Sequence, residues 1–254
     1  MFTTPFKSGS LPLSLILLLL ISLSGWQMCF AITLPSGLTS IERKKIVKQL
    51  GIPTSSKFLS NPYPLGGYVG IEFGVSYHLL DINDISLLGN QVTNNDSDLS
   101  ILELSFGKGL YNNVDVFFHF APFNTNDRVN SYGGILKWCF YEAKFLPINF
   151  SILTIGSVFH VSDSFVNQTL GLEFMTGINV DNLSIYFGAG QLSGEGHFIG
   201  GANGVVDNNE TTKEEEKISH LFLGLNFDLA NFFISAQMDR YTEPIFSAKL
   251  GMRY

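Results

Sequence analysis

Nine ionisable side chains occupy polar positions within largely apolar stretches of the sequence. A charge in such surroundings must pair with an opposite charge or be hydrated, because an isolated buried charge is costly. Two arrangements meet this requirement: a closed interior held by salt bridges, and a thin, charged pore. We favour the closed interior. The nine residues are Glu72, Glu103, Asp115, Lys137, Glu173, Asp228, Asp239, Lys249 and Arg253.

The histidines form no recognisable catalytic or metal-binding pattern. They have no paired spacing, and the sequence contains no H-E-x-x-H, C-x-x-C or serine-nucleophile motif. We therefore expect no enzyme active site, no cofactor and no metal ion. The histidines are His78, His119, His160, His197 and His220.

A cluster of carboxylates lies in the segment 193–216, which is rich in glycine and then acidic. Carboxylate oxygens bind divalent cations, but the spacing lacks the regular pattern of a calcium-binding loop. We favour a solvated surface loop over a cation site. The carboxylates are Asp207, Glu210, Glu214, Glu215 and Glu216.

The composition restricts the class of protein that carries these residues. The 254 residues are 45% apolar and 15% charged, and their mean hydropathy is +0.22. Soluble proteins contain about 25% charged residues. A membrane-spanning helix needs a run of about 20 apolar residues, and none follows the N-terminus. The net charge of −7, with no basic stripe, argues against nucleic acid as a partner. Amphipathic strands explain the high apolar content better.

Residues 1–31 have the features of a secretory signal peptide. Lys7 precedes a short apolar run, and small residues stand three and one positions before a cleavage after Ala31. An uncleaved N-terminal anchor is the alternative. Cleavage would remove Cys29 and leave Cys139 as the only cysteine, so we expect no intrachain disulfide.

From Gly66 onward the apolar residues recur with a period of two, which predicts strands with two unlike faces. In 217–229 the odd positions from Leu221 to Leu229 are apolar, and the even positions from His220 to Asp228 are small or polar, except Phe222. About ten strands follow from this pattern: 66–80, 98–110, 113–123, 131–144, 148–161, 166–180, 182–192, 217–229, 231–240 and 244–254.

The connections between these strands alternate in length. Links after odd-numbered strands are long or polar, whereas links after even-numbered strands are tight, as at Tyr111-Asn112 and Asp181. Long loops at one end and short turns at the other are typical of antiparallel barrels whose strands cross a membrane. Because both ends of the barrel then lie on one side, the strand number must be even.

The last segment, 244–254, ends on an aromatic residue and has apolar residues at every second position. It resembles the C-terminal strand of the bacterial outer-membrane β-barrel superfamily, and the pattern over 66–254 is similar to that family as a whole. The resemblance implies an all-β fold: an antiparallel up-and-down transmembrane barrel of about ten strands, although eight or twelve also fit. It identifies the C-terminal assembly signal as Phe246, Leu250, Met252 and Tyr254.

The same resemblance implies a location and a set of partners. The chain is expected in the outer membrane of a Gram-negative bacterium after cleavage near Ala31. Its partners would be outer-membrane lipid, lipopolysaccharide and the barrel-assembly machinery. The chain would divide into a signal peptide (1–31), a periplasmic N-terminal segment with a short helix (32–65) and the barrel (66–254).

The helix is predicted over 39–50. Thr39 and Glu42 form a capping box, and Gly51 ends the helix. The sequence leaves its role open between contact with a partner, a position at the barrel mouth and a simple N-terminal extension, and we favour the extension.

Three functions are compatible with this fold. A structural or surface-interaction barrel with a mostly closed, charged lumen is the expected one, and a narrow channel for small solutes is the alternative. The third and weakest is a protease at the outer rim, as some ten-strand barrels are, with His160, Asp163 and Asp239 as candidates. A soluble β-sandwich or lipocalin-like barrel is the main rival fold.

Overall fold

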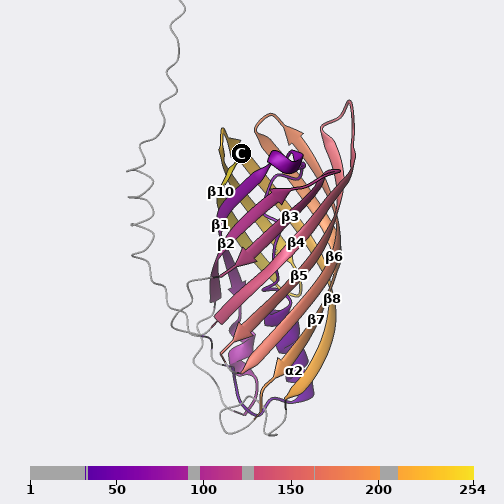
Figure 1. The fold of residues 1–254 in the computed structure, drawn as a ribbon. Coiled ribbons are helices and arrows are strands. Elements are labelled where there is room, and N and C mark those ends of the chain that lie inside the picture. Colours follow the sequence, from indigo (N-terminus) through magenta and orange to yellow (C-terminus); the bar gives the residue numbers. More distant parts are fainter. Residues whose placement is uncertain (1–31, 33, 91–97, 122–128, 163, 201–210) are drawn as a thin grey trace, which may run out of the picture.

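The structure is a computed structural model that describes residues 32, 34–90, 98–121, 129–162, 164–200 and 211–254. Ten antiparallel strands close into one barrel: each strand pairs with the next along the chain, and β1 pairs with β10 (Figure 1). The predicted ten-strand up-and-down barrel is therefore confirmed, and the counts of eight and twelve are wrong. Within the described residues no helix is long and apolar enough to cross a bilayer.

All ten predicted strands have an observed counterpart in the same place. They are β1 (Ile71–Asp81), β2 (Asp98–Gly109), β3 (Val114–Phe120), β4 (Val129–Glu142), β5 (Ile148–Val161), β6 (Phe165–Val180), β7 (Leu183–Phe198), β8 (Thr212–Leu229), β9 (Phe232–Arg240) and β10 (Pro244–Arg253). The first strand starts later than predicted, because Gly67–Val69 forms a turn of 3-10 helix, η2.

The barrel has a short-turn end and a long-loop end. The short-turn end carries the links 110–113, 143–147, 181–182 and 230–231 and the C-terminus, and it lies at the top of Figure 1. Left-handed backbone makes these turns tight: Asn112 and Asn113 have φ of 56° and 58°, and Asp181 has φ of 54°. Asn and Asp tolerate this conformation better than other residues with a side chain, and two-residue hairpin turns require it.

The strands β7 and β8 extend well beyond the predicted 182–192 and 217–229. They stay paired up to Phe198 opposite Thr212. The prediction that 193–216 forms a single loop is therefore wrong. Much of this segment continues the β7–β8 hairpin past the point where β9 ends. Of the five carboxylates of the predicted cluster, Asp207 and Glu210 lie outside the described residues.

The two faces of the barrel wall differ sharply in chemistry. On β8 the outward Leu221, Leu223 and Leu225 are 54%, 50% and 46% exposed, while the inward His220 and Asn226 are buried. The same alternation recurs along every strand, with apolar side chains outward and polar or small ones inward for most of each strand. A soluble barrel or sandwich places its apolar face inside, so that alternative is wrong.

The N-terminal helix forms as predicted and sits at the long-loop end. It consists of α2 (Ser40–Ile46), which continues as a turn of π-helix, η1 (Val47–Gly51). The hydroxyl of Thr39 accepts from the N–H of Glu42, and the Glu42 carboxylate accepts from the N–H of Thr39, which completes the capping box. The helix contacts β7 and β8.

After the helix, the chain passes through the inside of the barrel. We call this segment, Ile52–Leu65, the plug. Its residues from Ile52 to Asn61 are all buried, although they form no strand or helix. It begins beside Gly194 near the long-loop end of β7 and ends against Asp115 at the start of β3. The interpretation of the N-terminal segment as a simple extension is therefore wrong: the plug lies in the lumen, and the helix contacts β7 and β8 at the mouth of the barrel.

Candidate functional site

The barrel wall is shaped to receive the plug. Inward-facing glycines lie where the plug comes closest: a methyl group added at Gly194 would overlap Ile52, and one added at Gly177 would overlap Pro62. The ring of Phe58 packs edge-on against Phe117 of β3, with 5.5 Å between the ring centroids. The plug and the wall are therefore in close-packed contact inside the barrel.

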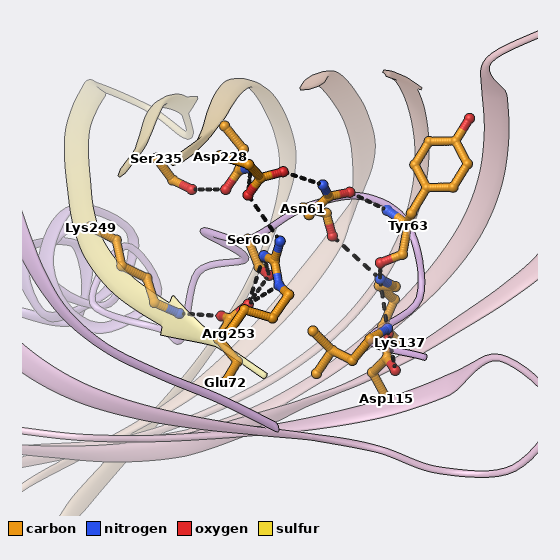
Figure 2. A network of polar contacts seen from close by, with 12 residues as sticks. Ser60, Asn61, Tyr63, Glu72, Asp115, Lys137, Asp228, Ser235, Lys249 and Arg253 are labelled. Atoms are coloured by element: carbon orange, nitrogen blue, oxygen red, sulfur yellow. Dashed lines mark hydrogen bonds and ion pairs between the residues drawn. The ribbon is translucent and has the colours of Figure 1, made fainter. Parts of the chain in front are cut away.

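Near the short-turn end, Glu72 of β1 is the centre of a polar network (Figure 2). Its carboxylate accepts from Lys249 Nζ at 2.8 Å and from Arg253 Nη2 at 2.8 Å, both on β10. The plug residue Ser60 donates to the same carboxylate at 2.6 Å. This network joins the two strands that close the barrel, and it ties the plug to their seam.

A second carboxylate, Asp228 of β8, extends this network. It accepts from Arg253 Nη1 at 3.1 Å and from the side-chain amide of the plug residue Asn61 at 3.0 Å. The amide of Asn226 also donates to Asp228 at 3.0 Å and, through its oxygen, accepts from Ser235 at 2.7 Å. The plug is thereby joined to β8 and β9 as well as to the seam.

A third pair holds the end of the plug on the other side of the lumen (Figure 2). Lys137 of β4 and Asp115 of β3 are both fully buried and 2.9 Å apart. Lys137 also donates to the carbonyl of Tyr63 at 2.7 Å, and Asp115 accepts from the backbone N–H of Leu65 at 3.1 Å. This wall pair therefore binds the plug backbone through both of its charged groups.

Further along the lumen, His220 of β8 lies between two carboxylates. One ring nitrogen is hydrogen-bonded to Glu173 of β6, and the other is 3.0 Å from Asp239 of β9. The ring stacks on Tyr241 with 4.1 Å between centroids. All four side chains are buried, so the imidazole is fixed in its orientation by two anions and an aromatic face.

A second group of histidines lies on β1, β2 and β3. The carboxylate of Glu103 is 3.4 Å from His78 Nε2 and 3.8 Å from His119 Nδ1, and it accepts from Ser131 at 3.1 Å. His78 is held from its other side by Ser247 at 2.8 Å. Among the described residues, neither ring nitrogen of His119 has a hydrogen-bond partner.

The plug contributes one charge to this region, Lys57, which is 3% exposed. Its ammonium group donates to the carbonyls of Pro53 at 2.6 Å and Ser55 at 3.3 Å, both within the plug. It also lies 5.8 Å from the ring centroid of Tyr241. We call Lys57 and six buried wall residues the middle layer; the six are Glu103, Glu173, Asp239, His78, His119 and His220.

The long-loop end is closed by the helix. Arg43 pairs with Glu214 of β8 at 2.8 Å, and Lys48 with Glu216 at 3.1 Å. The Glu42 carboxylate accepts from the backbone N–H of Gly89 in the β1–β2 loop at 3.0 Å. These backbone hydrogen bonds, first from the Thr39 N–H and then from Gly89, hold the pKa of Glu42 below its ordinary value.

Apolar side chains complete this closure. Ile46, Val47 and Leu50 of the helix are fully buried in one cluster with Ile85 and Leu88 of the β1–β2 loop. The helix, the loop and the extended hairpin therefore share a small hydrophobic core at the mouth.

The structure places all nine predicted interior charges on the inner face. Seven of them are at most 3% exposed, and the side chains of Asp228 and Arg253 are 26% and 21% exposed at the short-turn end. They form separate pairs and networks, not one cluster. Phe246, Leu250 and Tyr254 of the predicted assembly signal point outward and are 56%, 50% and 62% exposed. Met252 lies on the same face and is partly exposed.

The candidates for a rim protease do not come together. Asp239 is buried in the middle layer on β9, whereas His160 lies on β5, four strands away around the barrel. Asp163 lies outside the described residues. In the part of the chain that the structure describes, no group of three or more His, Cys, Asp or Glu residues is arranged to hold a metal ion.

The plug, Lys57 and the interior position of His78, His119 and His220 were not predicted from the sequence. Two of the histidines could have been placed inside from the alternation alone. His119 is four residues after the inward-facing Asp115 on β3, and His220 is eight residues before the inward-facing Asp228 on β8, so each shares a face with that carboxylate. The plug had no such signal: it has no periodicity, and its three prolines suggest a linker.

No family model matches the chain, and no curated protein matches its sequence. Solved structures with a similar fold include the N-terminal β-barrel domain of Pseudomonas aeruginosa OprF, with 11% identity and a TM-score of 0.38, covering 74% of this chain and 99% of that chain. Ail, the attachment invasion locus protein of Yersinia pestis, has 14% identity and a TM-score of 0.25, covering 73% and 97%. Neisserial surface protein A has 9% identity and a TM-score of 0.28, covering 72% and 94%. The barrel assignment rests on the strand pairing of this chain itself.

Proposed function

We propose that this chain is an outer-membrane β-barrel that does not conduct at rest and has a structural or surface-interaction role. The observation that carries this proposal is the plug. The plug fills the lumen and is bound by wall charges at the short-turn end, while the helix before it pairs with Glu214 at the long-loop end. A channel for small solutes, the alternative function, requires a continuous path that the plug occupies.

The outer surface supports the membrane location. Large apolar side chains such as Phe73, Leu172 and Phe187 are half exposed on the barrel wall, which is costly in water and favourable in lipid. Together with the N-terminal segment 1–31 of signal-peptide type, this favours the outer membrane, where β-barrels are inserted. We also propose that the outer face contacts lipid and that a barrel-assembly machinery recognises the terminal residue Tyr254.

The long-loop end supports the surface role. The residues 212–220 of β8 pair with β7, whereas β9 joins β8 only from Leu221 onward. This part of β8 therefore has an edge with no strand partner among the described residues, and Lys213, Glu215 and Lys217 point outward beside it. Exposed edges accept strands from other chains, and charged residues limit unspecific pairing.

The orientation has a consequence for the N-terminus. If the long loops face the cell exterior, as in other barrels of this kind, then α2 also lies on the outer side. We propose that the chain following the signal peptide starts at the cell surface and returns through its own lumen to β1. No catalytic constellation is included in this proposal.

Single-channel recording in planar bilayers at neutral pH tests the proposal. The purified full-length protein should be folded, as judged by faster gel migration before than after boiling, and should give no steady current. A stable open current at neutral pH would show that the plug does not close the lumen. Recovery of the protein in the soluble periplasm, not in outer-membrane fractions, would overturn the location.

A further inference from the structure

The part of β8 that extends past β9, Thr212–His220, has backbone groups without a partner strand. Successive residues of a strand direct their N–H and C=O groups to opposite neighbours. Asp228 donates its N–H to Asn182 at the start of β7, and the β7–β8 register has no shift, so the even-numbered residues of β8 bond to β7. The odd-numbered residues of the extension therefore have no strand beside them among the described residues. We call this row the β8 edge: Lys213, Glu215, Lys217 and Ser219.

The N-terminal helix holds the extension of β8 in place from its inner side (Figure 1). Arg43 pairs with Glu214 at 2.8 Å, and Lys48 pairs with Glu216 at 3.1 Å. Ile218 packs against the hydrophobic core. The β8 edge is therefore kept as an extended strand without help from β9. A second strand that pairs with it has little ordering entropy to overcome on this side of the contact.

The charges along the β8 edge are complementary to those of a second, antiparallel copy. The outward side chains are positive at Lys213, negative at Glu215 and positive at Lys217. With a two-fold axis at Glu216, Glu215 lies opposite Lys217 of the second copy, and the same pair occurs twice. A shift of two residues in one direction places Lys217 opposite Lys217, and a shift in the other places Glu215 opposite Glu215. Opposite charges stabilise cross-strand pairs and like charges destabilise them, so the charges select one register.

The side chains needed for these cross-strand pairs are available. Lys217 forms no ion pair with another described residue. Lys213 lies between two carboxylates, with Glu195 of β7 at 2.8 Å and Glu215 at 2.9 Å. Glu215 can therefore turn to a lysine of a second copy while Lys213 keeps Glu195. The outer face of the extension thus has one unpaired cation and one shared anion, which are the two groups that the selected register brings together.

We propose that the β8 edge is a homotypic adhesion site, at which two copies in facing membranes pair their β8 strands antiparallel and join their walls into one sheet. The proposal rests on the surface-interaction role proposed above. In antiparallel pairing the second β8 runs in the opposite direction, so its whole barrel is inverted and belongs to a facing membrane. A two-fold copy in the same membrane does not fit, because barrel strands tilt by about 35–45° and the two β8 strands would cross.

The selected register is also the one that uses every residue of the β8 edge. Each of the four residues exchanges an N–H and a C=O with the second copy, which gives about eight backbone hydrogen bonds. One such contact is small, but many copies in two facing membranes act together, so the joint attachment is much stronger than one pair.

Tethering of vesicles tests the proposal. The full-length protein is reconstituted into two batches of phosphatidylcholine vesicles that carry a donor and an acceptor dye, and energy transfer reports contact between batches. The parent should join the two batches. Glu215→Lys in both batches should reduce the tethered fraction about tenfold, because two opposite-charge pairs become like-charge pairs. Lys217→Glu in both batches should also reduce it, because Glu215 then faces a glutamate in the selected register.

Mixing the two variants separates the charge pattern from misfolding. One batch with Glu215→Lys and one with Lys217→Glu should tether as the parent does, because both cross-strand pairs again join opposite charges. Asp81→Lys is the matched control, since it reverses an exposed charge at the long-loop end of β1, three strands from β8, and should tether normally. Each variant is first checked for the unboiled gel shift of the folded barrel. Mixed batches that stay separate, or Glu215→Lys batches that tether like the parent, would overturn the site.

A cysteine on the two-fold axis tests the register itself. Residue 216 meets its own copy at a position without backbone hydrogen bonds, where Cα atoms are about 4.5 Å apart, within the range of a disulfide. Glu216→Cys should therefore form disulfide-linked dimers between tethered vesicles, whereas Glu215→Cys, displaced from the axis, should not. A folded parent that leaves the batches separate would overturn the adhesion site and leave the closed barrel standing. A steady current in planar bilayers would overturn the closed barrel and leave the β8 edge unaffected.

Discussion

Replacing Lys137 by methionine should destabilise the barrel strongly. Lys137 and Asp115 are 2.9 Å apart and fully buried on the paired strands β4 and β3. Removing one partner of a buried ion pair leaves an uncompensated charge and typically costs about 3–5 kcal/mol. The carbonyl of Tyr63 also loses its donor, and an unsatisfied buried group costs about 1–3 kcal/mol. Because part of this loss is already counted in the ion-pair value, we expect the total near the upper end of about 3–5 kcal/mol.

The measurement is urea unfolding of the protein in lipid vesicles, followed by tryptophan fluorescence. Lys144→Met is the matched control, because it makes the same change at an exposed position after β4 and should leave the midpoint unchanged. The double variant Lys137→Met/Asp115→Asn should regain a large part of the loss, since no buried charge is left unpaired. If Lys137→Met unfolds at the same urea concentration as Lys144→Met, the pair does not stabilise the plugged barrel and the reasoning is wrong.

Three further predictions concern the wall, the seam and the mouth. Leu223→Arg places a charge in the hydrocarbon and should cost about 2–4 kcal/mol near the midplane, more than Asn226→Arg, which enters the lumen beside acids. In the folded Leu223→Cys variant the thiol should be shielded from a water-soluble maleimide, and a fluorophore attached to it should be quenched by a spin label in the lipid phase. The reverse result would show that this face does not meet lipid. Truncation after Leu250 should prevent assembly, because it removes the seam partners of Glu72, Phe73 and Gly74 on β1 and leaves their backbone groups unpaired; normal levels of the truncated barrel would contradict this. Because the pKa of Glu42 is lowered in the folded protein, its stabilisation of the mouth is present above the ordinary carboxyl pKa and is lost as pH falls through the lowered value. Glu42→Gln should accordingly increase trypsin cleavage of the helix at neutral pH, whereas the exposed Glu215→Gln should not.

The strands were predictable because the closed barrel imposes the same constraint on each of them, with one face outward and the other toward the lumen. On β8, the outward positions from Leu221 to Leu229 are exposed and apolar and the inward positions face the lumen, which produces the period of two. Even the exception has a structural reason. Phe222 faces inward and packs at 5.3 Å on His220, inside the middle layer.

The plug was not predictable by the same route. A segment that is surrounded by wall on every side has no solvent face, so its sequence carries no periodicity. Pro53, Pro62 and Pro64 also remove backbone donors, which suits an extended chain that forms no ladder. A linker and a plug of this kind have the same local pattern, and only the contacts with residues more than 70 positions away in the sequence distinguish them.

The length of β7 and β8 was underestimated for a related reason. Beyond Leu192 the outward side chains are no longer apolar, since Lys213 and Glu215 point outward there. The apolar signal therefore ends before the strands do, because the hydrogen-bonded ladder continues to Phe198 opposite Thr212. Hydrophobic periodicity marks the apolar part of the outer face, not the full length of the strands.

The interior of this barrel combines two kinds of core that usually exclude each other. A water-filled lumen needs polar walls, and a packed core needs apolar ones. Here Ile52 and Phe58 of the plug pack against glycine and aromatic side chains of the wall, while Ser60 and Asn61 complete the ion-pair networks at the short-turn end. The wall alone therefore has too few apolar contacts to be a closed core, and its charges have too few partners. The plug supplies both, which is why the N-terminal segment must be regarded as part of the barrel and not as an extension of it.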